Sequence, residues 1–160
     1  MESSKRALTA LNQLRKHRER RAGNRLQQAE RKRRDLREQL NSLAGTIEEQ
    51  QQNQRDRQDS LFAEIQGRPL TLEQYQAYLG ELERFEREQR DLRQERNERR
   101  IELFNIERER ASAQSEYRHK TQQREKSDEI ARFMEQRNRE AALRQEESAR
   151  EEMGNQRSRT

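Results

Sequence analysis

The sequence predicts an all-α protein, namely a long antiparallel two-helix coiled-coil hairpin, and three observations predict it. Charged residues make up 42% of the 160 positions and hydrophobic residues only 27%, so too little apolar surface is present for a wide globular core. The chain is rich in Arg, Glu, Gln, Leu and Ala, which favour helices, and it has no Val, one Pro and five Gly. Its apolar residues recur at alternating intervals of three and four, which is the spacing of a coiled-coil seam.

Disorder is the competing interpretation, because Leu, Ile and Phe number only 15, 5 and 4. Two features of the composition favour helix instead. The 36 basic and 31 acidic residues nearly balance, and the most abundant residues are good helix formers. Because β-branched residues are scarce, we expect no sheet.

The first helical arm is predicted over residues 1–66. Its seam can be followed from Ala22 to Leu61, with polar residues at several seam positions. Long side chains such as Arg can lay their aliphatic stems along an interface, so these positions do not break the pattern. The seam positions are Ala22, Leu26, Ala29, Arg33, Leu36, Leu40, Leu43, Ile47, Gln50, Gln54, Arg57 and Leu61.

The bend is predicted at residues 67–71, where signals that end a helix meet signals that start one. Gly67 can adopt the left-handed conformation that terminates a helix, and Pro69 prevents its continuation. Thr71 and Gln74 form the pattern of a capping box for the next helix. The chain should therefore reverse its direction here.

The second helical arm is predicted over residues 72–138, and residues 139–160 should form an overhanging, fraying tail without a partner. The seam positions of this arm are Leu82, Phe85, Gln89, Leu92, Arg96, Arg99, Leu103, Ile106, Arg110, Ala113, Tyr117, Ala131 and Met134. In an antiparallel hairpin, residues whose numbers add to about 139 should face each other. The expected pairs include Ile47 with Leu92, Leu36 with Leu103 and Ala22 with Tyr117.

Acidic and basic residues four positions apart are expected to support both arms, by about 0.2–0.5 kcal/mol for each pair. Such pairs can sustain helix where the seam is poor. The pairs are Glu30/Arg34, Glu83/Arg87, Glu86/Arg90, Glu95/Arg99, Glu116/Lys120, Glu135/Arg139, Glu140/Arg144 and Glu146/Arg150.

The sequence contains no recognisable catalytic or metal-binding motif, and we expect neither enzymatic activity nor a cofactor. No Gly-rich phosphate loop, HExxH pattern or G-x-S-x-G motif occurs, and there is no Cys. Carboxylates are abundant, but neighbouring Arg and Lys compensate them on a solvated surface rather than in a cleft. His17 and His119 would lie at nearby levels of the hairpin, yet no third ligand accompanies them, so we interpret both as surface residues.

Residues 1–37 are strongly basic, with 13 Lys or Arg against 4 Asp or Glu. Nucleic acid would attract such a surface, but no aromatic residues interleave with the cations to stack on bases. An acidic protein surface is the favoured partner, and a solvated helix face without a partner is the alternative. A membrane-surface role for the apolar residues of segment 7–14 is less favoured, since they also serve the hairpin by facing Ile130 and Phe133.

The stretch around the bend is the most apolar and aromatic part of the chain. It contains Leu61, Phe62, Ile65, Leu70, Leu72, Tyr75, Tyr78, Leu79, Leu82 and Phe85. Because a two-helix seam is too narrow to bury all of them, we expect Phe62, Tyr75 and Tyr78 to stay partly exposed. Exposed aromatic residues are typical anchors for a partner, and stapling of the bend is the equally favoured alternative.

A charged two-helix chain of this length, with a central G-x-P-L-T bend followed by Tyr75-Gln76-x-Tyr78-Leu79-x-x-Leu82-Glu83, resembles the type III secretion stalk proteins. These proteins form the YscO/HrpO group and are similar to the flagellar export protein FliJ. The resemblance covers nearly the whole chain in architecture, and its motif lies in the stretch after the bend.

The resemblance implies a non-catalytic central stalk that links a hexameric secretion ATPase to an export gate protein, with secretion chaperones as further partners. The gate-side residues would be Tyr75, Tyr78, Leu82, Phe85 and Gln89. The ATPase-side residues, which would meet acidic groups lining a pore, would be Arg15, Arg18, Arg21 and Arg25.

On this interpretation the protein is a cytoplasmic monomer that is peripheral to a membrane complex and binds neither a small-molecule substrate nor nucleic acid. Its seam is richer in Arg and Gln, and its tail more hydrophilic, than in the more apolar examples of the family. The alternative function is a generic coiled-coil scaffold or an oligomerising structural protein, which a seam of this kind would also serve.

Overall fold

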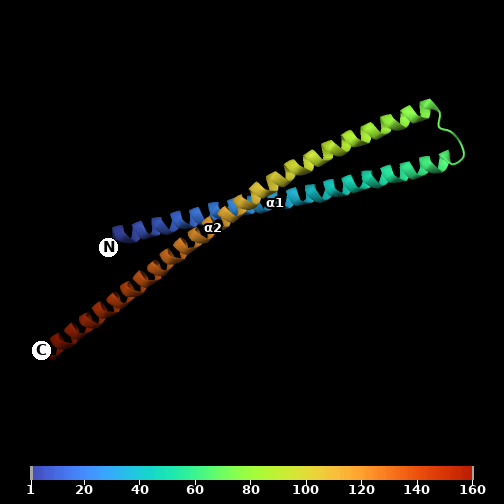
Figure 1. The fold of residues 1–160 in the computed structure, drawn as a ribbon. Helices are drawn as coiled ribbons and strands as arrows, with labels where there is room; N and C mark the ends of the chain where they lie inside the picture. The colour runs from blue at the N-terminus through green and yellow to red at the C-terminus, as the bar shows by residue number, and fades with distance from the viewer. Residues whose placement is uncertain (1, 160) are drawn as a thin grey trace. The chain divides into compact units, whose positions relative to one another are not determined.

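The protein, described over residues 2–159 by a computed structural model, consists of two helices. Helix α1 spans Glu2–Ile65, helix α2 spans Leu72–Ser158, and a short bend joins them (Figure 1). The two helices pack against each other in antiparallel directions, and no strand occurs within residues 2–159. The predicted all-α, two-helix hairpin is confirmed.

The bend has the local structure that its residues predict. Gly67 has a φ of 91°, in the left-handed region that ends a helix, and the Arg68 amide donates to the Ile65 carbonyl at 3.0 Å. Thr71 and Gln74 form a reciprocal capping box, because each backbone amide donates to the other's side-chain oxygen at 3.3 Å. Helix α1 therefore ends at Ile65, one residue before the predicted end of the first arm, and α2 begins at Leu72.

A seam of buried and half-buried residues follows the spacing of three and four along both helices. In α1 it comprises Leu8, Asn12, Arg15, Glu19, Ala22, Leu26, Ala29, Arg33, Leu36, Leu40, Leu43, Ile47, Gln50 and Gln54. In α2 it comprises Tyr78, Leu82, Phe85, Gln89, Leu92, Arg96, Arg99, Leu103, Ile106, Arg110, Ala113, Tyr117, Lys120, Arg124, Ser127 and Ala131. Met134, which was predicted to continue the seam, is 41% exposed, because the contact with α1 ends before it.

Contacts between the helices set a register close to the predicted one. The Gln89 side-chain amide donates to the side-chain oxygen of Gln50 at 3.2 Å. Arg110 lies 3.8 Å from the Glu30 carboxylate. Both pairs agree with the predicted register to within one residue, so the spacing of the seam is sufficient to align the two arms.

Near the bend, the seam departs from the predicted positions. Arg57 was predicted in the seam, but its guanidinium is exposed and donates to the Glu81 carboxylate at 3.2 Å. Gln58 is half-buried in its place and donates to the Tyr78 hydroxyl at 3.3 Å. This adds a second successive step of four residues to the α1 seam, which locally unwinds a left-handed supercoil. The prediction for Arg57 was wrong because a solvated carboxylate partner keeps its cation in water.

Ion pairs on the flanks run across the seam more often than along one helix. Of the eight pairs expected within helices, only Glu135 with Arg139 is closed within residues 2–159, at 2.9 Å. Glu116 instead pairs with Arg25 of the other helix at 2.8 Å. This flank of α2 carries a glutamate at every seventh residue, namely Glu81, Glu88, Glu95, Glu102, Glu109 and Glu116. Two of these glutamates, Glu81 and Glu116, pair with Arg57 and Arg25 of α1, and both contacts favour the antiparallel pairing.

The segment predicted to be a fraying tail, residues 139–160, is helical over its described part. Helix α2 continues to Ser158, and its acidic and basic side chains alternate closely along this stretch. All side chains of residues 132–159 are exposed. The end of α2 therefore extends beyond the last seam residue without burying a face.

The chain divides into two compact units, and both helices run through each of them. We call Met1–Leu26 with Ala113–Thr160 the terminal unit, and Gln27–Ser112 the bend unit. The terminal unit carries 19 Lys or Arg against 12 Asp or Glu, whereas the bend unit carries 17 against 19. The basic character of the chain therefore resides in the terminal unit.

Candidate interaction surfaces

The bend unit exposes part of the aromatic group that the sequence singles out. Phe62 and Tyr75 are 69 and 50% exposed, whereas Tyr78 is half-buried. Leu82 and Phe85 are also half-buried, because they occupy seam positions of α2. Among the residues expected on the gate side, Tyr75 therefore offers the most surface to a partner.

Gln89 lies in the seam rather than on an accessible surface. It is 5% exposed, and its side-chain amide donates to Gln50 at 3.2 Å and to the Ile47 carbonyl at 3.5 Å. Its side-chain nitrogen is therefore engaged across the seam, while its side-chain oxygen is buried without a hydrogen-bond partner, so neither group reaches the surface. The expectation that Gln89 contacts a partner does not fit this geometry, because the spacing that identifies Gln89 also buries it.

A hollow of about 750 Å³ lies at the bend between the end of α1 and the start of α2. Leu61, Ile65 and Leu70 supply its apolar lining, and the ion pair of Arg57 with Glu81 lies at its edge. A space of this size accepts side chains of a partner. Its lining combines apolar and charged groups, a mixture that suits contact with a protein surface.

The four arginines expected on the ATPase side divide between surface and seam. Arg18 and Arg21 are exposed and make no ion pair within residues 2–159. Arg25 is also exposed, but it pairs with a glutamate of α2 at 2.8 Å. Arg15 lies in the seam, where its guanidinium donates to the Gln123 carbonyl at 2.8 Å. Arg18 and Arg21 are therefore the cations most available to a partner.

A polar network fills the seam of the terminal unit. Arg15 donates to the hydroxyl of Ser127, which is only 1% exposed. Nearby, Arg124 forms ion pairs with Glu19 and, at 3.0 Å, with Asp128. Hydrogen bonds to Glu19 and then to Asp128 raise the pKa of Arg124. Because the pKa of Arg124 is higher in the folded chain than in the unfolded chain, these contacts stabilise the fold at any pH below the unfolded value. That contribution is lost only in strong alkali, and Arg124 is charged near neutral pH.

An apolar group of the terminal unit remains exposed, contrary to expectation. Leu11, Leu14, Ile130 and Phe133 are 39–61% exposed. They were expected to cover one another within the hairpin, but each lies one position to the side of the seam heptads. The seam here passes through Asn12, Arg15, Arg124 and Ser127, so polar residues lie between the helices. Counting back in steps of seven residues from the apolar seam positions near the bend would have predicted that Leu11 and Leu14 lie beside the seam.

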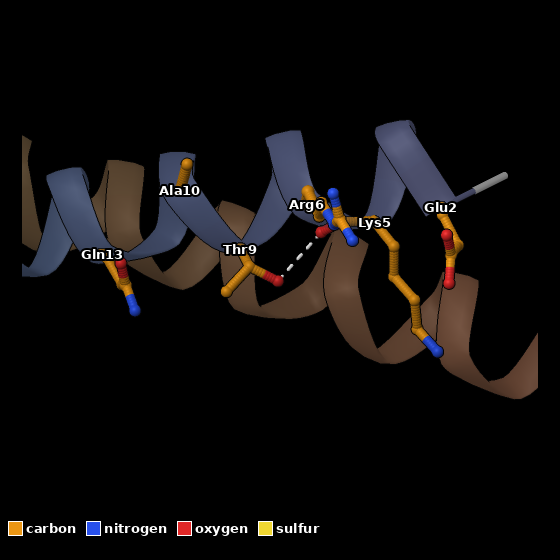
Figure 2. Close-up of a pocket in the computed structure, with 6 residues that line it drawn as sticks. All are labelled: Glu2, Lys5, Arg6, Thr9, Ala10 and Gln13. Atoms are coloured by element: carbon orange, nitrogen blue, oxygen red, sulfur yellow. Dashed lines mark hydrogen bonds between the residues drawn. The ribbon is translucent and has the colours of Figure 1, made fainter.

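The two histidines do not belong to a metal-binding group among the described residues. No group of three or more His, Cys, Asp or Glu is placed to hold a metal ion within residues 2–159. His17 is exposed, and Nε2 of His119 lies 3.1 Å from the Gln123 side-chain nitrogen of the same helix. A hollow of about 420 Å³ is lined by α1 alone, and the Thr9 hydroxyl there donates to the Lys5 carbonyl at 2.9 Å (Figure 2). That hydroxyl is engaged within its own helix.

Two findings concern the chain as a whole. Neither helix, as described over residues 2–159, has a stretch long and apolar enough to cross a membrane. Compared with known proteins, the chain matches no family model, no curated protein and no solved structure.

Proposed function

We propose that this chain is the non-catalytic central stalk of a bacterial type III secretion export apparatus and links a hexameric export ATPase to an export gate. The observation that carries the proposal is the antiparallel pair closed by a capped G-x-P-L-T bend with exposed aromatic residues beside it. These are the residues on which the resemblance to the secretion stalk group depends. The proposal includes a cytoplasmic location and secretion chaperones as further partners.

The exposed cations of the terminal unit are the proposed contacts with the ATPase. Arg18 and Arg21 make no ion pair within residues 2–159, and the pair made by Arg25 is solvated enough to exchange partners. Acidic groups lining a pore would attract these cations at long range and hold them with low specificity. Such a fit suits one helix pair that meets several equivalent subunits.

The bend surface is the proposed contact with the gate. Tyr75 is exposed on the first turns of α2, and Tyr78 borders the hollow at the bend. An aromatic side chain beside an apolar hollow is the usual composition of a binding hot spot. Leu82 and Phe85 support this surface from the seam.

The proposal is tested by mixing the purified chain with the cognate export ATPase at low salt and measuring association and ATP hydrolysis. We expect association that the double variant Arg18→Gln/Arg21→Gln weakens about tenfold, because it removes long-range attraction. The double variant Arg87→Gln/Arg93→Gln makes the same charge change on exposed residues of the bend unit and should bind as the unchanged chain does. Failure of the unchanged chain to associate at low salt would contradict the proposed function.

A further inference from the structure

One side of the terminal unit exposes a group of apolar residues from both helices. We call this group the flank patch, and it consists of Ala7, Leu11, Leu14, Ile130 and Phe133. Its four large side chains keep 39–61% of their surface exposed. In a chain with only 27% hydrophobic residues, so many apolar side chains left in water indicate a binding surface.

Contacts within the terminal unit place both halves of the flank patch on the same side. The ion pair between Arg25 of α1 and Glu116 of α2 marks this side. In a coiled coil, each step of seven residues returns to the same side. Two such steps lead back from Arg25 to Leu11, and two lead forward from Glu116 to Ile130; in an antiparallel pair both run in the same direction. The other members lie three or four residues from these two, on the same face of each helix.

Four exposed cations surround the flank patch, and each lies one step of seven residues from a patch member. They are Arg18 and Arg21 on α1 and Lys126 and Arg137 on α2. None of them forms an ion pair among the residues that the structure describes, and the Arg137 guanidinium lies 5.9 Å from the centre of the Phe133 ring. The two remaining positions one step of seven from the α2 members are Gln123 and Glu140, so one acidic residue also lies there. This side is therefore apolar in the middle and positive around it.

A second exposed Phe-Arg pair lies in the bend unit and serves as a comparison, because it lacks the surrounding cations of the flank patch. Phe104 is 62% exposed, Ile101 beside it is 63% exposed, and the Arg108 guanidinium lies 5.9 Å from the Phe104 ring centre. The other positions that lie seven residues from Ile101 or Phe104 are uncharged, namely Gln94, Asn97 and Ala111. This pair has the same local chemistry as Phe133 with Arg137 but lacks the ring of cations.

We propose that the flank patch is a docking surface for an anionic phospholipid bilayer. Leu, Ile and Phe side chains partition into the boundary between headgroups and acyl chains, and Arg and Lys around them bind lipid phosphates. The apolar residues lie on two neighbouring helices, with Arg18, Arg21 and Lys126 at one end of the patch and Arg137 at the other, an arrangement that suits a charged plane. Since these residues stay exposed, packing within the hairpin does not compete with this role.

This inference goes beyond the stalk function, because contact with a bilayer needs no ATPase. Arg18 and Arg21 take part in both proposals, so a bilayer and an acidic pore would occupy this side in turn. The bilayer alone would also engage Phe133 and Lys126, which the ATPase proposal does not use. Vesicle binding and ATPase association are measured in separate mixtures, so either proposal can fail without the other.

The first experiment uses the full-length chain, which contains no Trp, so that one introduced Trp reports its own surroundings. Phe133→Trp places the reporter in the flank patch, and Phe104→Trp places it on the matched pair of the bend unit. Vesicles of phosphatidylcholine with one third phosphatidylglycerol are compared with vesicles of phosphatidylcholine alone. We expect a blue shift of emission for Phe133→Trp with anionic vesicles only, and no shift for Phe104→Trp.

The second experiment measures affinity for the same vesicles by cosedimentation. Arg18→Gln/Lys126→Gln should weaken binding about 25-fold, at about fivefold for each cation lost. Leu14→Gln/Phe133→Gln should weaken it about tenfold or more, because less apolar surface enters the boundary. The matched Ile101→Gln/Phe104→Gln variant should bind as the unchanged chain does, and circular dichroism verifies that each variant stays helical.

Equal binding to neutral and anionic vesicles would overturn the proposal, and so would an equal loss in the Ile101→Gln/Phe104→Gln variant. Binding to an acidic amphipathic peptide without binding to vesicles would also overturn it, since the flank patch would then serve a protein. Loss of binding when the ionic strength rises to about 0.5 M is the result expected for lipid phosphates, because cations at the surface are screened over short distances.

Discussion

The bend unit and the terminal unit share two helices and one heptad spacing, yet among the described residues only the bend unit buries apolar side chains as large as Leu and Ile. In the bend unit, Leu36 and Ile47 lie in the seam with 8 and 6% of their surface exposed. In the terminal unit, the seam holds Arg15 bonded to the buried Ser127, while apolar residues such as Phe133 lie outside it. The seam of the bend unit therefore buries larger apolar side chains than the seam of the terminal unit, where the buried residues are Ala22, Ala113 and Ser127.

This difference indicates how a long coiled coil selects the faces that pack together. The faces are determined where apolar residues are concentrated, and the heptad spacing extends the same faces along the rest of each helix. Because α1 and α2 are uninterrupted, the seam of the terminal unit receives whichever residues fall at those positions. Several polar side chains there find partners across the seam, as Arg124 does with Glu19. We therefore expect apolar burial to hold the bend unit and directional, salt-sensitive contacts to hold the terminal unit.

The largest expected effect comes from removing an apolar seam residue of the bend unit. Ile47→Ala should lower the free energy of unfolding by about 2–3 kcal/mol, since it removes buried methyl groups and leaves a cavity. Urea denaturation followed by circular dichroism measures the loss, and amide hydrogen exchange locates it. Ile101→Ala removes the same atoms from an exposed position and should change the stability by no more than about 0.5 kcal/mol. Equal losses in the two variants would show that the seam does not hold the bend unit.

Much of the fold could be predicted because its signals are local or repeated. Gly67 and Pro69 end one helix, and Thr71 with Gln74 starts the next, through contacts within a few residues. The register follows from many heptads in succession, so single polar residues do not disturb it. Arg57 escaped prediction because its place depends on Glu81, which lies on the other helix.

The candidate surfaces were less predictable, because spacing identifies a face but not how much of it is covered. Gln89 fits the seam and was also expected to contact a partner, yet only the structure shows that its amide is engaged with Gln50. Leu11 and Phe133 were expected to cover each other, and whether a residue lies in the seam or one position beside it depends on distant heptads. The exposed Arg18 and Tyr75 were predicted as accessible partner residues, and their binding roles stay predictions.

A smaller effect is expected from removing a polar contact of the terminal unit. Ser127→Ala deletes the buried hydroxyl that accepts from Arg15 and should lower the free energy of unfolding by about 1 kcal/mol. The reference is Ser115→Ala, on an exposed position of the same helix, which corrects for the higher helix propensity of Ala. Hydrogen exchange should rise in residues 113–131 and stay unchanged around the bend. If the two serine variants behave alike, the polar network does not hold this unit.

The smallest effect compares two glycines inside α1, one in each unit. At Gly45 of the bend unit an added Cβ would meet no atom within 4 Å, so Gly45→Ala should raise the free energy of unfolding by about 1 kcal/mol through helix propensity alone. At Gly23 of the terminal unit the added carbon would lie 3.2 Å from the Tyr117 ring, which must then move. Gly23→Ala should therefore gain about 0.5 kcal/mol less than Gly45→Ala, as measured by thermal denaturation. An equal gain at both positions would mean that the Tyr117 ring moves aside at no cost in free energy. The terminal unit would then be packed more loosely around Tyr117 than around its polar seam residues.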